Sequence, residues 1–148
     1  MKNMALLIDA NVVLDYLLKR QPQYTDAMIT AYYCEKYNVK SYIAFHTVSI
    51  IWYHLRKIPK AERRKLLLNV TNLFTVVSAP HEKVVDAIKQ ENFPDFEDCL
   101  QEKCALAVNA DFIVTNNTKD FKASTIPAVT PAEMLKIFFA EMERNNET

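Results

Sequence analysis

The stretch Met4-Ala5-Leu6-Leu7-Ile8-Asp9 sets the fold class, because five consecutive apolar residues end directly in a carboxylate. A continuous apolar run is typical of a strand buried on both faces of a parallel sheet. Outward from it, the sequence predicts short strands at residues 41–45, 73–77, 112–115 and 128–129. Helical patterns fill the segments 11–19, 24–37, 47–57, 60–72, 80–90, 95–108 and 130 onward. This alternation predicts an α/β domain with a mainly parallel sheet and helices on both faces.

The length of 148 residues suits one domain with one core. We expect that domain to span residues 1–143 and the polar residues 144–148 to form a disordered tail. The apolar run near the N-terminus is too short for a signal peptide or a membrane span. A cytoplasmic protein without a membrane segment is therefore expected.

Composition excludes several classes of site. Glycine is absent, which rules out a glycine-rich phosphate-binding loop in its usual form. Left-handed positions must then be filled by other residues, and Asn38, Asn109 and Asn116 are the candidates. Three widely spaced cysteines argue against a disulfide framework or a zinc site. Eighteen basic residues balance eighteen acidic ones, so affinity for nucleic acid would have to come from a local basic patch.

Acidic and amide side chains gather where the predicted strands end. Asp9 follows the first strand, and residues 115–117 with Asp120 follow the fourth. Sites in such sheets form beyond the carboxyl ends of the strands, so these side chains are expected to meet, together with Asp95 and Asp98 at a helix start. Crowded carboxylates cannot all stay ionised without a cation, and a hard divalent ion would both relieve the repulsion and activate water.

Each of these residues also has an interpretation without a metal. Asp9 and Asp95 occupy positions where a side chain caps a helix, and the two roles can coexist. Asp120, Asn11 and Asn117 are residue types that form turns with their own backbone. The positions alone leave both alternatives open.

Three motifs in order resemble PIN domains, including VapC-like toxin ribonucleases: residues 9–15 (DANVVLD), 95–101 (DFEDCLQ) and 115–121 (TNNTKDF). The resemblance implies a Rossmann-like three-layer α/β/α sandwich and cleavage of RNA that depends on Mg²⁺ or Mn²⁺. It aligns Asp9 with the first acidic ligand and Asp98 with the third. Asn117 stands where many relatives carry the fourth acid, and Asp120 matches the aspartate three residues further on.

The sequence departs from that pattern in the helix after the second strand, where Ile50 stands in place of the usual second acid. A site with fewer charges binds metal more weakly. Either Asp95 compensates, or the domain is a weakly active or inactive module that binds RNA or protein. The resulting assignment has Asp9, Asp98 and Asp120 as catalytic ligands, Asp95 as a further metal ligand, and Asn11, Thr115 and Asn117 around them.

Binding of RNA needs positive charge, and six basic residues fall within residues 56–65. The predicted RNA contacts are Arg56, Lys57, Lys60, Arg63, Arg64 and Lys119, with a solvated helix face as the alternative for the run. The C-terminal helix carries a wide apolar surface, which suggests a homodimer or a groove for an antitoxin peptide. A phosphoacceptor receiver domain is disfavoured, because residues 76–78 (VVS) offer no aspartate after the third strand.

Overall fold

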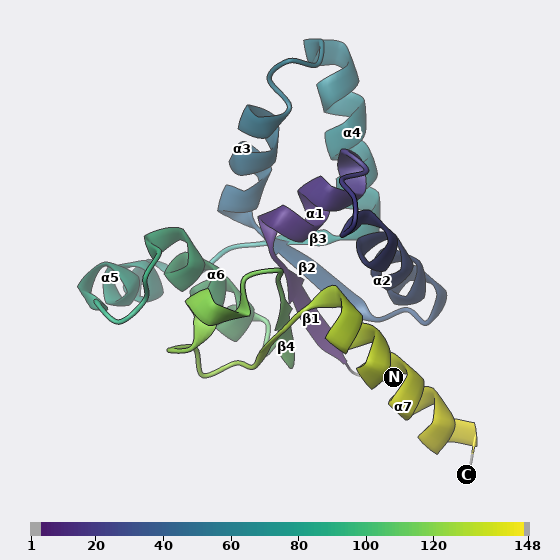
Figure 1. Ribbon diagram of the computed structural model, residues 1–148. Helices are drawn as coiled ribbons and strands as arrows, with labels where there is room; N and C mark the ends of the chain where they lie inside the picture. The colour runs from purple at the N-terminus through teal and green to yellow at the C-terminus, as the bar shows by residue number, and fades with distance from the viewer. Residues whose placement is uncertain (1–3, 147–148) are drawn as a thin grey trace.

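The computed structural model describes residues 4–146 and contains one sheet of five parallel strands (Figure 1). The strands are β1 (Ala5–Ile8), β2 (Lys40–Ala44), β3 (Thr75–Val77), β4 (Phe112–Val114) and β5 (Ala128–Val129), arranged in the order β3-β2-β1-β4-β5. Neighbouring strands pair in parallel throughout, with Leu7 beside Tyr42 of β2 and Ile113 of β4. The predicted α/β class is confirmed, and β1 occupies the centre of the sheet.

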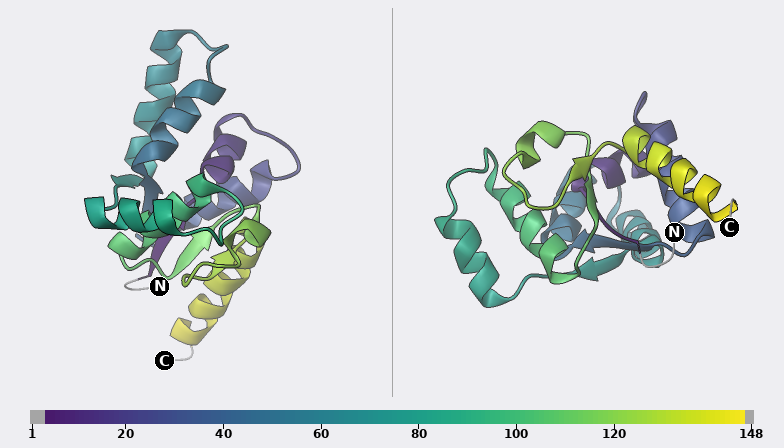
Figure 2. Two further views of the ribbon diagram at one scale, coloured as in Figure 1. Left: turned by 90° about the vertical axis from the view of Figure 1, so that its left-hand side faces the viewer. Right: turned by 90° about the horizontal axis from the view of Figure 1, so that it is seen from below.

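Helices cover both faces of this sheet, which gives three layers (Figures 1 and 2). They are α1 (Ala10–Leu17), α2 (Tyr24–Lys36), α3 (Phe45–His54), α4 (Lys60–Leu73), α5 (His81–Lys89), α6 (Phe96–Ala107) and α7 (Pro131–Asn146), with a short 3-10 helix η1 (Thr118–Phe121). Helices α5 and α6 pack together on one face, while α1, α2 and α7 lie on the other. The paired helices α3 and α4 extend away from the sheet. Within the described residues, no helix is long and apolar enough to cross a membrane.

The central strand divides the core because its side chains alternate between the two faces. Leu6 and Ile8 join an apolar cluster that includes residues of α1, α2 and α7. Leu7 joins a second cluster with Cys99 and Cys104 of α6. All three β1 leucine and isoleucine side chains are essentially inaccessible to solvent. A rigid strand buried on both sides therefore ends at Asp9.

The C-terminal helix uses its wide apolar surface mostly within the chain itself. Met134, Leu135 and Phe138 are buried in the cluster on the α7 face, while Phe139 stays 45% exposed. The helix continues through Asn146, three residues into the expected tail, and an Arg144–Glu141 ion pair supports its last turn. Residues 147 and 148 of that tail lie outside the described residues.

Within residues 4–146, tight turns use the left-handed backbone conformation at three positions, none of them glycine. Asn38 (φ 54°) and Asn109 (φ 51°) adopt it as expected. Asn116 does not, and Lys19 (φ 52°) adopts it instead, just after α1. A long side chain in this region is disfavoured, so the turn after α1 must be held by other contacts.

Candidate metal centre at the carboxyl edge of the sheet

Asp9 is fixed by the end of β1 and by two side chains from distant segments. It is 5% exposed, and its amide donates to the Val114 carbonyl of β4 at 2.9 Å. Its Oδ2 accepts a hydrogen bond from the Thr115 hydroxyl at 2.8 Å, and its Oδ1 accepts one from the Gln101 amide at 3.3 Å. The side chain accepts no hydrogen bond that caps α1. The carboxylate is therefore oriented by tertiary contacts.

Gln101 links three segments behind Asp9. Its side chain is 1% exposed, and its Nε2 donates to the Thr47 hydroxyl of α3 at 3.1 Å as well as to Asp9. Its Oε1 is buried without a partner among the described residues. The sequence motifs do not single out Gln101 or Thr47 as site residues. The available signal was that Gln101 lies one turn after Asp98, on the same face of α6.

Asp98 projects from the first turn of α6 into a crowded acidic environment. Burial raises its pKa to about 7, and the neighbouring charges of Asp9, Asp95 and Asp120 add to that rise. A carboxyl group that shares its surroundings with like charges holds its proton more tightly. Asp98 is therefore close enough to the other three carboxylates to respond to their charge.

The remaining acidic residues divide between capping and the site. Asp95 is exposed, and its Oδ1 accepts a hydrogen bond from the Glu97 amide at 2.9 Å, which confirms the cap interpretation. Asp120 is half-buried in η1, and its amide donates to the Asn117 carbonyl at 3.0 Å. Burial also raises the pKa of Asp9, against the opposing hydrogen bond from Thr115. The charges of Asp95 and Asp120 thus add to the raised pKa values of Asp9 and Asp98, while Asp95 also caps α6.

The carboxylates of Asp9 and Asp98 suit a divalent cation that is held by few protein ligands. Among residues 4–146, no three His, Cys, Asp or Glu side chains lie together closely enough to hold a metal ion unaided. Mg²⁺ commonly keeps several waters and binds through one or two carboxylates plus substrate phosphates. Asp9 and Asp98 supply hard oxygen atoms. The pKa of Asp98 is raised first by burial and then by repulsion from neighbouring carboxylates, and a cation would relieve that repulsion.

The two asparagines predicted at the site, Asn11 and Asn117, form their hydrogen bonds through backbone groups. The backbone amide of Asn117 donates to the Thr115 hydroxyl at 3.0 Å, while the Asn117 side chain is exposed. Asn11, in the first turn of α1, accepts a hydrogen bond from Arg20 on its carbonyl at 3.4 Å. Thr115 is fully buried and connects Asn117 to Asp9.

A model of the PIN domain family matches residues 5–119, which is most of the chain. This chain belongs to the PIN domain family. The match covers β1 through the first half of η1, and thus Asp9, Asp95 and Asp98 but not Asp120. The family predicted from the three motifs is confirmed. Comparison with curated protein sequences gave no match.

Solved structures share the fold of this PIN domain at low sequence identity. VapBC2 from Rickettsia felis, bound to a DNA fragment from its promoter, is 18% identical with a TM-score of 0.62, covering 86% of this chain and 98% of that one. VapBC-1 from nontypeable Haemophilus influenzae is 20% identical with a TM-score of 0.61, covering 87% and 99%. PAE2754 from Pyrobaculum aerophilum is 17% identical with a TM-score of 0.61, covering 93% and 90%. These likenesses establish the three-layer fold.

The α3 side of this PIN domain contributes neutral groups where the family pattern has an acid. Ile50 is half-buried, and the buried polar residue of that helix is Thr47, bonded to Gln101. His46 Nε2 donates to the Glu97 carbonyl at 3.3 Å, which joins the first turns of α3 and α6. Burial lowers the pKa of His46, so its ring brings no positive charge near neutral pH.

The basic residues predicted to bind RNA occupy different environments. Arg56, Lys57 and Lys60 are exposed where α3 turns into α4, about 15 Å along α3 from the sheet edge at 1.5 Å per residue. Arg63 is 8% exposed, with its guanidinium 4.2 Å from the centre of the Trp52 ring. Lys119 is exposed in η1, next to Asp120.

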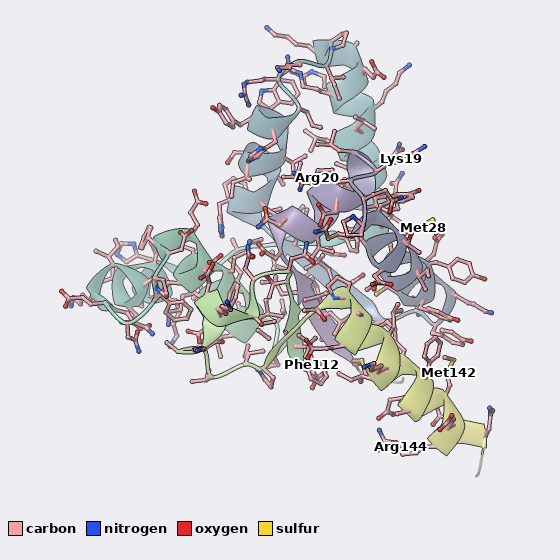
Figure 3. The ribbon with its side chains drawn as sticks, in the orientation of Figure 1. Lys19, Arg20, Met28, Phe112, Met142 and Arg144 are labelled. Atoms are coloured by element: carbon pink, nitrogen blue, oxygen red, sulfur yellow. The ribbon has the colours of Figure 1, made fainter. Side chains whose placement is uncertain are left out.

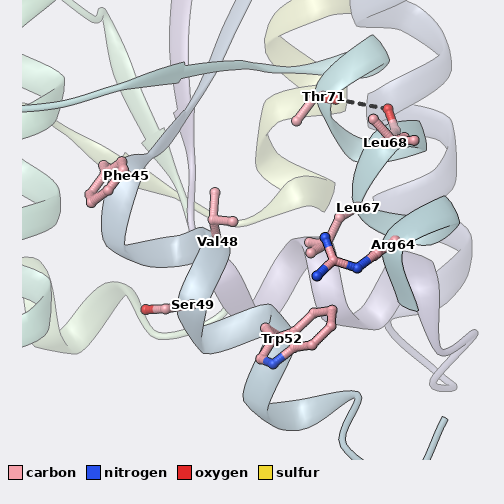
Figure 4. Close-up of a pocket in the computed structure, with 8 residues that line it drawn as sticks. All are labelled: Phe45, Val48, Ser49, Trp52, Arg64, Leu67, Leu68 and Thr71. Atoms are coloured by element: carbon pink, nitrogen blue, oxygen red, sulfur yellow. Dashed lines mark hydrogen bonds between the residues drawn. The ribbon is translucent and has the colours of Figure 1, made fainter. Parts of the chain in front are cut away.

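An apolar groove of about 570 Å³ lies between α3 and α4 (Figure 4). Its lining consists of Phe45, Val48, Ser49, Trp52, Arg64, Leu67, Leu68 and Thr71. Phe45 is 70% exposed and Leu68 is 63% exposed, which is unusual for large apolar side chains. Arg64 points across the groove beside Trp52, at 5.6 Å from its ring centre. The groove begins where β2 ends and leads away from the carboxylates.

Proposed function

We propose that this PIN domain is a ribonuclease that hydrolyses RNA phosphodiester bonds with Mg²⁺ or Mn²⁺. The observation that carries the proposal is the crowding of Asp9 and Asp98 at the carboxyl edge of the sheet, where the pKa of Asp98 rises to about 7. Such perturbed carboxylates cluster at functional sites. The family's typical nuclease activity and the hard oxygen ligands support the same chemistry.

Each residue of the site has a task in this proposal. A bound divalent ion supplies Lewis acidity and lowers the pKa of a bound water, so that no protein nucleophile is required. Asp9 and Asp98 would hold the ion, and Thr115 with Gln101 keeps the Asp9 carboxylate in one orientation. Asp120 adds negative charge at the edge of the site. The positive charge of Lys119 would attract a phosphate group of the RNA backbone.

Removal of the metal tests this function. Purified protein treated with EDTA is expected to leave a mixed RNA pool intact, and added Mn²⁺ or Mg²⁺ is expected to restore cleavage, because the carboxylates alone cannot activate water. Asp86→Asn serves as a control variant, since Asp86 is exposed on α5, where it pairs with Lys83. Cleavage that survives EDTA, or that never occurs with either ion, would contradict the proposal.

A second function, the binding of a partner helix, is favoured by the groove between α3 and α4. Its apolar floor suits the apolar face of an amphipathic helix. Arg64 in its wall and the exposed Arg56, Lys57 and Lys60 beyond its end favour acidic residues on that helix. We infer that an antitoxin of this chemistry occupies the groove, with this chain acting as a cytoplasmic toxin. A homodimer stays a prediction.

Trp52 is the single tryptophan of the chain and lines the groove, so its fluorescence reports occupancy. Titration with an acidic amphipathic helical peptide is expected to shift the emission of wild-type protein. Leu68→Asp should weaken binding by about 10-fold or more, because burial of a leucine contributes roughly 1.5–3 kcal/mol. Ile88→Asp is the matched control, since Ile88 is 65% exposed on α5, away from the groove. Equal affinities of the two variants would contradict this site.

A further inference from the structure

Asp15 is a buried carboxylate that belongs to neither the metal centre nor the groove. It lies in α1, is 5% exposed, and uses both of its oxygens. Its Oδ1 accepts a hydrogen bond from Arg20 Nε at 2.8 Å, and its Oδ2 accepts one from the Asn116 side-chain amide at 2.5 Å. Asn116 is 101 residues away in the chain, in the loop that follows β4. A buried charge needs such partners, and here one of them comes from a loop of the candidate site.

That loop is held from two sides by aspartates at opposite ends of α1. Thr115 donates to Asp9, which precedes the helix, and Asn116 donates to Asp15 near its end. The Asn117 amide then bonds to the Thr115 hydroxyl at 3.0 Å, and the Asp120 amide bonds to the Asn117 carbonyl at 3.0 Å. Hydrogen bonds therefore lead from Asp9 through Thr115 and Asn117 to the backbone of Asp120, and the bond from Asn116 ties the same loop to Asp15.

The turn after α1 is shaped so that Arg20 returns to this helix. Lys19 adopts the left-handed conformation, and the Arg20 amide donates to the Asp15 carbonyl at 3.1 Å. The Arg20 guanidinium bonds to Asp15 and to the Asn11 carbonyl (Figure 3 labels Lys19 and Arg20 at this turn). A disfavoured backbone conformation persists where surrounding contacts over-determine it. Arg20 thus fixes the Asp15 side chain in the orientation that receives Asn116.

We propose that Asp15 is a positioning residue for the nuclease site: it clamps the 115–120 loop through Asn116 and so fixes Asp120 relative to Asp9 and Asp98. The proposal rests on the proposed function, because it assigns Asp15 a place in that site. It goes beyond a structural role for Asp15, which would consist only of tying α1 to the following turn through Arg20.

Asn116→Ala separates the two roles, because it removes the contact with the loop and leaves the pair between Asp15 and Arg20 in place. A displacement of about 1 Å in a catalytic group can cost about 10²-fold in rate, so kcat should fall by about 10- to 100-fold. KM should change little, and the melting temperature should fall only modestly, since Asp15 keeps its ion pair with Arg20. Arg20→Gln is the comparison variant, and it should lower the melting temperature more than Asn116→Ala does.

An exchange of the two side chains tests the contact itself. Asn116→Asp alone places two carboxylates together and should lower kcat at least as far as Asn116→Ala. Adding Asp15→Asn restores a hydrogen bond in the reverse direction, and it should recover about 10-fold or more of the lost rate. A double variant no faster than Asn116→Asp, with a normal melting temperature, would overturn the clamp.

Amide hydrogen exchange of residues 116–121 gives a readout that does not depend on RNA cleavage. Exchange in this segment should be faster in Asn116→Ala than in wild type, while exchange in α1 stays unchanged. Wild-type exchange and wild-type kcat in Asn116→Ala would overturn the proposal. If the wild-type protein cleaves no RNA, the nuclease function fails, and the exchange rates still decide whether Asp15 positions the loop.

Discussion

Asp98→Asn is expected to abolish RNA cleavage while making the protein more stable at about pH 8. The asparagine side chain cannot offer a charged oxygen to a divalent ion, so the rate of cleavage should fall by about 10³-fold or more. Loss of a residue that only supports a metal ligand costs less, roughly 10–100-fold. Asp98 makes no hydrogen bond that the substitution would break among those found in the described residues. The loss of cleavage would therefore come from the missing metal ligand and not from a damaged fold.

The gain in stability follows from the direction of the Asp98 pKa shift. The folded protein raises this pKa from 3.8 to about 7, so ionisation of Asp98 opposes folding progressively as the pH rises between those values. Asparagine carries no charge to repel. The melting temperature of Asp98→Asn should exceed that of wild type at about pH 8, and the difference should vanish near the unperturbed pKa of about 4.

Thermal unfolding of Asp98→Asn, wild type and Asp86→Asn at both pH values measures this effect. Asp86→Asn should match wild type in cleavage and in its melting temperature, because that carboxylate is exposed on α5. A lower melting temperature of Asp98→Asn at the higher pH would contradict the crowding of carboxylates, and the loss of cleavage would then reflect a damaged fold.

Affinity for Mn²⁺ is expected to fall by about tenfold for each pH unit below about 7 and to be constant above it. A proton on Asp98 competes with the ion, and its pKa of about 7 sets where that competition ends. A carboxyl with the ordinary value of 3.8 would leave the affinity constant down to about pH 5. Calorimetric titrations of wild type between about pH 5.5 and 8 measure the slope and the protons released. An affinity that does not change over that range would contradict the shifted pKa.

The fold and part of the site could be predicted because they follow from local patterns. The apolar run before Asp9 indicates a buried strand, and parallel strands end at one edge, which brings Asp9 and the loop after β4 together. Of the two alternatives that the position of Asp95 leaves open, the hydrogen bond from the Glu97 backbone amide confirms the cap, and the metal-ligand role stays a prediction. The 3-10 helix at Thr118–Phe121 is not among the elements that the sequence predicts, since a single short turn has no periodicity.

The contacts that orient the site could not be predicted, because they join residues far apart in sequence. Gln101 meets Asp9 across 92 positions, and Asn116 meets Asp15 across 101. Neither pair has a sequence signal independent of the fold. The exposure of the basic side chains in residues 56–65 could not be predicted either. Charge alone does not reveal that Arg63 packs on Trp52 while Lys60 faces solvent. Side-chain direction within α4 decides that difference.

Calorimetric titration of Mn²⁺ into wild type and Asp98→Asn at about pH 8, with cleavage of an RNA pool followed in the same samples, tests the central claim most directly. Binding and cleavage in the wild type, both lost in the variant, are the predicted result. Absence of Mn²⁺ binding by the wild type, with and without RNA, would contradict it. The neutral residues Ile50 and Asn117 would then leave the site with too little negative charge to bind a metal ion. The groove between α3 and α4 would remain as the functional surface.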